Sequence, residues 1–396
     1  MKKIKYGIFL TLLATVSFQT NAATTEKNDI EQLAHEINNL KQIINELSIQ
    51  NERRQDYQPS FFSKNQSKID IYGFVRADAA YQFEGGNAMF NRINKITLDN
   101  DPNKKMTEDR FDATVTTSRI GLDLVSPIMN SMINGKIEVD FRGGDKNDTI
   151  RIRHAFVEMD NWLVGQTTSN FVSFESAPEI LDFNTALGGG TTRTPLIRYK
   201  DNLSALTNYQ IGLEKGNDQN RLPAATAKIT HKFSNNSGFI NARTLVQEVR
   251  LRDENDHTKF GWGIGLGTKY NLNSALALTA DFSHMAGDDK FLFGSDNTRY
   301  VKNDNTIKLI DFNTLQLGAT YKFNQQLRST IGYGALFYEN NSDGNNDRLQ
   351  QGWINVMYNP IKPITFGLEY IHGERKLTNN ISGTDSRIEF MTKYEF

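Results

Sequence analysis

The sequence contains no cysteine, only 8 prolines and, beyond its N-terminal residues, no long apolar run. Without cysteine the chain cannot form disulfides, zinc-thiolate sites, iron–sulfur clusters or a thiol nucleophile. The mean hydropathy is −0.53 and no apolar run approaches the roughly 18 residues of a membrane-spanning helix, which excludes a helical membrane protein. A net charge of −1 lacks the basic excess of nucleic-acid-binding proteins, so we expect no nucleic-acid partner.

The first 22 residues have the pattern of a secretory signal peptide. Lys2, Lys3 and Lys5 precede an apolar stretch from Gly7 to Phe18, and Thr20-Asn21-Ala22 then offers small residues at the −3 and −1 positions of a cleavage site. A membrane anchor is the alternative, but about 12 apolar residues are too few to cross a ~30 Å hydrocarbon core. We therefore expect residues 1–22 to be removed and the chain to be exported.

Residues 23–50 carry a heptad pattern. Apolar residues spaced three and four apart keep one seam on a helix of 3.5 residues per turn, which predicts a short coiled coil; they are Ile30, Leu33, Ile37, Leu40, Ile44 and Leu47. With Ile30 at position a, Glu36 and Lys41 can pair between chains, which favours a homo-oligomer. An amphipathic helix docked on its own domain is the alternative, since three heptads are marginal alone. Residues 51–67 are polar, contain Pro59 and predict a linker.

From Lys68 onward the period changes to two. In the first such stretch Ile69, Ile71 and Val75 share one face, while Asp70 and Arg76 lie on the other. No interval between the alternating stretches resembles a crossover helix. The pattern predicts about sixteen strands, near residues 68–83, 113–126, 132–143, 149–159, 161–167, 193–200, 206–215, 222–233, 237–251, 258–271, 275–287, 311–323, 326–339, 349–359, 362–374 and 384–396.

The predicted connections alternate between short turns and mostly longer loops. The longest loops span about 84–112, 168–192 and 288–310. An even number of antiparallel strands with short turns at one end and longer loops at the other is typical of a bacterial outer-membrane barrel. The sequence therefore predicts an all-β chain, a 16-stranded antiparallel transmembrane β-barrel over residues 68–396, preceded by the short α-helical coiled coil.

The polar faces of the strands are too charged for a closed soluble core. Arg119, Asp123, Lys136 and Glu138 would be buried without water at several kcal/mol each. A secreted β-sandwich, the alternative fold, would not need sixteen strands with aromatic residues at their ends. We therefore expect the apolar faces to contact outer-membrane lipid and the polar faces to line a water-filled channel.

The last strand ends the chain on an aromatic residue. Alternating apolar residues precede this end, and the pattern is similar to the signal by which bacterial outer-membrane barrels are recognised for assembly. The residues expected to form that signal are Phe390, Tyr394 and Phe396.

The third long loop is unusually apolar for an exposed loop. Phe171, Phe174, Leu181 and Phe183 fall within residues 170–192. Folded into the barrel, these side chains can pack on the inner wall while nearby carboxylates narrow the channel. The predicted acidic residues of this constriction loop are Glu175, Glu179 and Asp182.

Three stretches around this loop resemble the DcaP-like family of trimeric outer-membrane porins. They are Ile152-Arg153-His154-Ala155-Phe156, the run from Asn161 to Thr168, and Leu181-Asp182-Phe183 followed by Gly188 to Pro195. The likeness covers nearly the whole mature chain. It implies a periplasmic N-terminal coiled coil, a homotrimer, and a channel for small anionic solutes, dicarboxylates among them.

The selectivity of a porin is set by its lumen charges and by its narrowest radius. Arginine suits carboxylates because its planar guanidinium offers two parallel donors. Lumen phase or loop position nominates Arg119, Arg193 and Arg198 first, followed by Arg76, Arg142, Arg328 and Arg387. For each of them, pairing with a lumen carboxylate is the alternative role.

No enzyme motif accompanies this pattern. Gly261, Gly263, Gly265 and Gly267 alternate within a strand and have no helix after them, unlike a phosphate loop. No His-Glu-x-x-His, Gly-x-Ser-x-Gly or EF-hand spacing occurs, so we expect no catalysis, cofactor or metal. Two alternatives to an anion porin stay open: a general or cation-preferring porin, and an outer-membrane anchoring protein that uses its periplasmic coiled coil.

Overall fold

The computed structural model describes residues 60–62, 67–90, 92–129, 131–253, 256–292, 299–303 and 306–396. These residues belong to a compact unit that runs from Pro59 to Phe396. The predicted signal peptide and the six apolar residues of the predicted coiled coil lie outside the described residues. Among the residues that are described, no helix is long and apolar enough to cross a bilayer.

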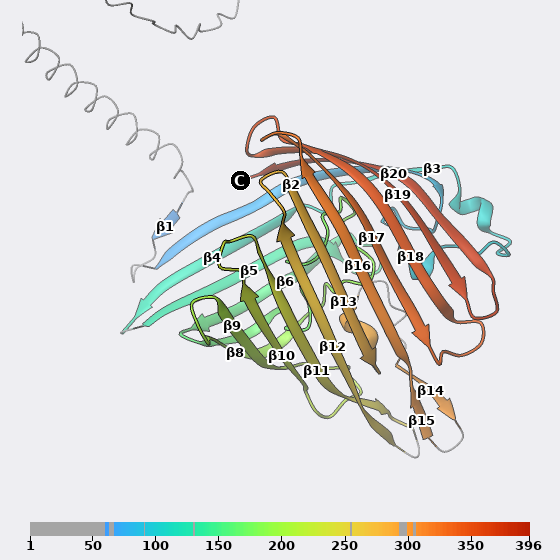
Figure 1. Ribbon diagram of the computed structural model, residues 1–396, viewed down its shortest axis with the longest axis horizontal. Helices are drawn as coiled ribbons and strands as arrows, with labels where there is room; N and C mark the ends of the chain where they lie inside the picture. The colour runs from blue at the N-terminus through green and yellow to red at the C-terminus, as the bar shows by residue number, and fades with distance from the viewer. Residues whose placement is uncertain are drawn as a thin grey trace, which may run out of the picture. The chain divides into compact units, whose positions relative to one another are not determined.

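Antiparallel strands make up most of the described chain (Figure 1). Within the described loop residues lie three short 3-10 helices: η1 (Ile93–Lys95), η2 (Lys104–Thr107) and η3 (Asp289–Phe291). The strands are β1 (Ser60–Phe62), β2 (Lys68–Glu84), β3 (Arg110–Thr114), β4 (Arg119–Ile128), β5 (Ser131–Gly143), β6 (Thr149–Met159), β7 (Trp162–Thr168), β8 (Arg193–Asn202), β9 (Thr207–Glu214), β10 (Ala224–Lys232), β11 (Gly238–Leu251), β12 (His257–Asn271), β13 (Leu276–Ala286), β14 (Tyr300–Asn303), β15 (Thr306–Leu309), β16 (Asp311–Lys322), β17 (Leu327–Glu339), β18 (Asn346–Tyr358), β19 (Ile364–Leu377) and β20 (Ser382–Glu395).

The sheet closes on itself because the last strand pairs with β2. The register of this seam runs from Phe74 opposite Glu395 to Glu84 opposite Ser386. β3 and β4 both pair with β2 and together serve as one strand of the wall, whereas β14 and β15 form a separate two-stranded hairpin. The result is the closed 16-stranded antiparallel barrel that the sequence predicts. The short β1, which lies within the predicted linker, adds three pairs to β2.

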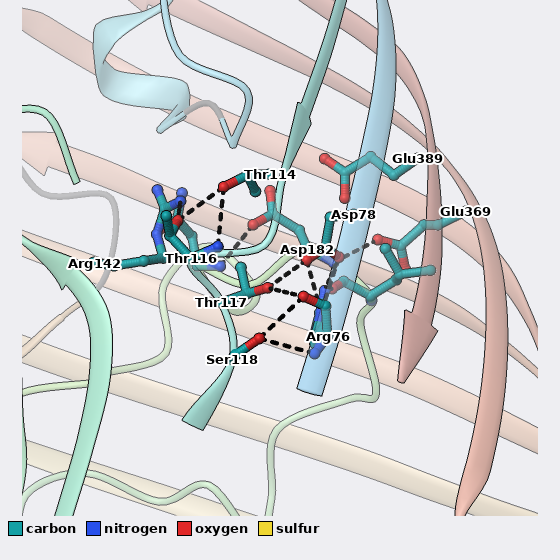
Figure 2. A network of polar contacts seen from close by, with 12 residues as sticks. Arg76, Asp78, Thr114, Thr116, Thr117, Ser118, Arg142, Asp182, Glu369 and Glu389 are labelled. Carbon is teal, nitrogen blue, oxygen red and sulfur yellow. Dashed lines mark hydrogen bonds and ion pairs between the residues drawn. The ribbon is translucent and has the colours of Figure 1, made fainter. Parts of the chain in front are cut away.

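The predicted strand over 113–126 is interrupted at residues 115–118. Thr117 donates to Asp78 Oδ2 at 2.6 Å, and Ser118 Oγ accepts from the backbone N–H of Arg76 at 3.0 Å (Figure 2). Both contacts connect β2 to residues 115–118 through side chains, in place of the backbone hydrogen bonds of a continuous strand. A local hydroxyl can compete with the ladder in this way, and alternation of apolar residues does not reveal it.

The two faces of the wall have the polarity of a membrane barrel. On β19 and β20, Leu368 opposes Phe390 and both rest exposed on the outside, while the neighbouring pair Glu369 and Glu389 is buried on the inside. Exposed apolar and buried polar residues are the reverse of a soluble protein and match a surface that contacts lipid. Aromatic residues gather toward the short-turn ends of the strands, as interfacial girdles do; among them are Trp162, Tyr270, Tyr321, Tyr358 and Tyr394.

Part of the interior is a packed apolar core. Inward positions on five strands hold Leu245, Met285, Phe312, Leu336 and Leu349, all of them buried. Apolar residues of the long loops pack against these positions; they are Ile93, Ile96, Phe171, Leu187, Phe291, Leu292 and Ile310. The sequence predicts apolar side chains of residues 170–192 on the inner wall of a water-filled channel; the core also holds apolar residues of two other long loops, which that prediction does not include. Buried charged side chains lie on both sides of this core, among them Arg153 on β6, Arg243 on β11 and Arg387 on β20.

Candidate functional site

The segment between β7 and β8, residues 169–192, lies inside the barrel; we call it the inner segment. The backbone N–H groups of Leu181 and Asp182 donate to the two carboxylate oxygens of Glu369 on β19, at 2.8 and 3.0 Å. Ser176 donates to Asp281 on β13 at 2.6 Å. Because both carboxylates are buried and face inward on strands far along the sheet, the inner segment crosses the interior.

Each predicted acidic residue of the inner segment pairs with a base on the wall. Glu179 binds Arg328 on β17 with both oxygens, the shortest contact being 2.7 Å. Glu175 lies 3.1 Å from the ammonium of Lys228. Asp182 binds Arg387. The carboxylates therefore anchor the inner segment as ion pairs.

Burial and these pairs act on the acidity of the inner segment in opposite directions. Burial would raise the pKa of Glu175, but the Lys228 ammonium and a hydrogen bond from Ser173 hold that pKa below its usual value. Burial raises the pKa of Asp182, although the Arg387 guanidinium opposes the rise. Glu175 therefore keeps its charge more readily than Asp182 does.

A polar cavity of about 520 Å³ lies between the inner segment and the early strands of the wall. Three aromatic rings contribute to its lining: Phe74, Phe174 and Phe183. Seven basic side chains line it, and Asp182 is the one carboxylate among the lining residues. The basic residues are Arg76, Arg92, Arg119, Arg151, Arg153, Arg193 and Lys393.

Aromatic rings help to fix the guanidinium groups. Arg119 lies over Phe74, with 5.0 Å between the guanidinium carbon and the ring centroid. Arg193 lies over Phe174 at 5.6 Å. Such contacts orient a cation without neutralising it, because a ring supplies a quadrupole and no net charge.

Two wall carboxylates balance part of this charge. Arg153 binds Glu138 and Asp140, each at 2.8 Å, and Arg151 binds Asp140 at 2.6 Å. Arg119 lies 3.4 Å from Glu138. Three guanidinium groups thus share two carboxylates. Arg76 pairs with Asp78 and Lys393 with Glu395, each at 2.6 Å. The seven basic side chains of the lining therefore meet four wall carboxylates, and the cavity keeps an excess of positive charge.

The sequence-predicted arginines divide into two groups. Arg76, Arg119 and Arg193 line the cavity, and Arg142 lies over the rings of Phe90 and of Phe183, a lining residue. The other three hold the inner segment or its ends: Arg198 donates to the carbonyl of Thr168, Arg328 binds Glu179, and Arg387 binds Asp182.

Sequence reasoning missed Arg92, Arg151, Arg153 and Lys393. The exposed outward residues Ile150 and Ile152 alternate with Arg151 and Arg153, so the alternation of this strand could have predicted both arginines on the inner face. A register shift between Glu138 and Val139 then brings both Arg153 and His154 to the cavity, which no strict alternation would allow.

The C-terminal aromatic residues lie on the outer surface. Phe390, Tyr394 and Phe396 are all exposed there, and the backbone of Phe396 exchanges two hydrogen bonds with Gly73 at 3.1 Å each. This position leaves the three side chains accessible from outside the barrel.

Comparisons with known proteins agree with this architecture. The family model for the DcaP outer membrane protein matches residues 22–396. The crystal structure of the outer membrane channel DcaP of Acinetobacter baumannii is 39% identical in sequence, with a TM-score of 0.79; the match covers 85% of this chain and 99% of that chain. Among curated protein sequences, none matches this chain.

More distant structures share the fold. A trimer form of OmpT from Vibrio cholerae matches at 12% identity and a TM-score of 0.53, covering 83% of this chain and 99% of that one. An anion-selective porin from Comamonas acidovorans matches at 14% identity and a TM-score of 0.57, covering 83% of this chain and 100% of that one. At such identities the likeness concerns the barrel alone.

Proposed function

The chain belongs to the DcaP outer membrane protein family and is an outer-membrane channel of that type, and from this premise we propose that it is an anion-selective porin for small solutes such as dicarboxylates. The observation that carries the proposal is the lining of the cavity, with seven basic side chains and one carboxylate. Selectivity follows the charges at the narrowest point of a channel, so the mildly acidic total of the chain does not oppose it.

The geometry of the lining suits an anion with two carboxylates. A guanidinium group donates two parallel hydrogen bonds to a carboxylate, and several such groups surround this cavity. Among the described residues no carboxylate pairs with Arg193, whose Nη1 donates to the Thr191 carbonyl at 3.1 Å, so its guanidinium keeps its charge for a solute. No covalent bond is made or broken in this function, so the protein acts as a channel and not as an enzyme.

The proposal extends to export and assembly. Residues 1–22 act as the signal peptide, and residues 23–50 form a periplasmic coiled coil joined to the barrel by the linker. Three copies assemble, in line with the trimer form known for a porin of the same fold. The exposed apolar wall contacts outer-membrane lipid or a neighbouring copy.

The test is the reversal potential of the purified protein in planar bilayers under a salt gradient. We expect anion selectivity in the native protein, reduced in the double variant Arg119→Gln, Arg193→Gln and unchanged in the control Arg252→Gln, an exposed residue outside the cavity lining. Block by a small dicarboxylate should weaken in the double variant.

Each other outcome points to an alternative. Cation selectivity in the native protein would reject the anion porin and keep a general or cation-preferring channel. A folded oligomer without conductance would favour an anchoring protein. Deleting residues 23–66 separates these roles, because a channel keeps conducting without the coiled coil whereas an anchor loses its periplasmic partner.

A further inference from the structure

The turn of the inner segment meets the wall at a cluster of five buried carboxylates. Asp78 on β2, Asp182 in the inner segment, Glu369 on β19, and Asp385 and Glu389 on β20 are each at most 3% exposed. Figure 2 shows Asp78, Asp182, Glu369 and Glu389 close together. Arg76 binds Asp78 at 2.6 Å, and Arg387 binds Asp182, Asp385 and Glu389. So many carboxylates in one buried place repel one another unless some carry a proton.

Glu369 holds the main chain of the turn. Its two oxygens accept three N–H groups: those of Leu181 and Asp182, at 2.8 and 3.0 Å, and the side-chain amide of Asn355, at 2.9 Å. All three partners are donors, which suits an ionised carboxylate and not its acid form. Glu369 is therefore tied to the backbone of the inner segment, independently of the side chains that the segment carries.

Other groups of the wall hold the same turn. The indole N–H of Trp353 donates to the carbonyl of Glu179 at 2.9 Å, and Arg76 donates to the carbonyl of Leu181 at 2.7 Å. Trp353 therefore holds the start of the stretch from Glu179 to Asp182, and Arg76 and Glu369 hold its end. The turn is thus held by hydrogen bonds to its main chain as well as by the ion pairs of Glu179 and Asp182.

Glu389 is the least satisfied carboxylate of the cluster. It lies directly opposite Glu369 in the register of β19 and β20. One oxygen accepts from Arg387 Nε at 2.6 Å, and the other has no hydrogen-bond partner among the described residues. A buried carboxylate with a single donor and an ionised neighbour favours its neutral form.

We propose that Glu369 is a positioning residue for permeation, because it holds the turn of the inner segment against the wall; we call this contact the latch. The neighbouring Glu389 is protonated when the latch is closed. The inference deepens the proposed channel function and rests on it. When Glu389 loses its proton, a new charge appears beside Glu369 and Asp182. Repulsion then loosens the turn, and the path past the inner segment widens.

Every charged group packed around Glu389 bears on this response. Asp385 and Arg387 share its strand, Glu369 faces it from β19, and Asp78 and Arg76 face it from β2. Asp182 approaches from the inner segment, and Arg142 on β5 lies beyond Asp182 (Figure 2). Carboxylates outnumber the guanidinium groups, so ionisation of one more carboxylate increases an existing excess of negative charge.

Single-channel conductance between about pH 6 and pH 10 tests the latch in planar bilayers. The native channel should conduct about twofold more at the alkaline end, because the path widens. Glu389→Gln should stay at the low conductance throughout, and Glu369→Gln at the high one. Glu374→Gln, a matched control on the outer face of β19, should follow the native profile.

A cysteine pair tests the same proposal without removing the latch. The chain has no native cysteine, and a Cβ built at Gly367 comes within 2.5 Å of the Leu181 side chain. Oxidised Leu181→Cys, Gly367→Cys protein should lose the alkaline rise and regain it on reduction. This variant keeps the test informative if Glu369→Gln fails to fold.

Two results would overturn the latch: an alkaline rise that persists in Glu389→Gln or in the oxidised cysteine pair, or a native conductance that does not change with pH. Failure of the proposed function looks different. A cation-selective native channel that still opens at alkaline pH would reject anion selectivity and leave the latch in place.

Discussion

Replacing Arg387 by methionine should destabilise the barrel more than any exposed charge substitution. The Arg387 side chain is 0% exposed and binds Asp182, Asp385 and Glu389, whose side chains are also almost fully buried. Removing one partner of a buried ion pair costs about 3–5 kcal/mol, because the remaining charge stays buried without compensation. Here Asp182 and Asp385 lose their shared cation and Glu389 loses its hydrogen-bond donor, so we expect a loss of at least about 3 kcal/mol.

The matched control is Lys215→Met. Lys215 and Asp218 form an ion pair of 2.8 Å, but their side chains are 60% and 85% exposed. Exposed pairs contribute about 0–1 kcal/mol. Urea unfolding of the purified protein in detergent micelles, followed by the fluorescence of its 3 tryptophans, measures both variants.

A second substitution separates charge from shape. In the Arg387→Met background, Asp182→Asn removes one of the uncompensated carboxylates and should recover part of the lost free energy of unfolding. If Arg387→Met unfolds within about 1 kcal/mol of the Lys215→Met control, the guanidinium is not the counter-charge of this cluster. The assignment of Arg387 as an anchor would then be wrong.

Three further substitutions probe the core, the ion pairs and the chain end. Phe171→Ala, in the apolar core inside the barrel, should lower the free energy of unfolding by about 3–5 kcal/mol in the same urea assay. Glu175→Gln should lower the free energy of unfolding by up to about 1 kcal/mol at neutral pH, since the glutamate is partly exposed. The pKa of Glu175 in the folded protein lies below the ordinary 4.5, so this difference from the native protein should persist down to about pH 4.5 and disappear as the pH falls through the lowered pKa. Phe396→Ala should reduce the yield of heat-modifiable barrel in the outer membrane while shifting the urea midpoint little, because the ring is exposed and its backbone bonds to Gly73 remain; an unchanged yield would contradict a role in assembly.

The strands of the wall and their outward faces could be predicted from sequence, because the face on which a strand residue lies depends only on its neighbours in the chain. A residue such as Leu368 shows its outward phase through its immediate neighbours, since a strand has period two. The interruption between β3 and β4 could not be predicted in this way, because it depends on the hydroxyl of Thr117 reaching Asp78 across the sheet.

The fate of each lumen arginine could not be predicted for a related reason. Strand phase places Arg76, Arg119 and Arg328 on the inside alike, but it does not say which of them meets a carboxylate. Arg328 finds Glu179, which lies 149 positions earlier in the chain, and Arg387 finds Asp182, 205 positions earlier. The path of the inner segment decides which guanidinium groups meet its carboxylates, whereas Arg76 pairs with Asp78 and Arg119 lies near Glu138 on the wall itself.

The seam between β2 and β20 affects the order in which the barrel folds. Consecutive strands of the wall are neighbours in the chain and pair over shorter loops, whereas the seam joins Phe74 to Glu395, more than 300 positions apart. Loop closure over such a separation is slow compared with hairpin formation. We therefore expect the seam to form last, and an open sheet with two unpaired edges to be the species most exposed to aggregation while the barrel is being built.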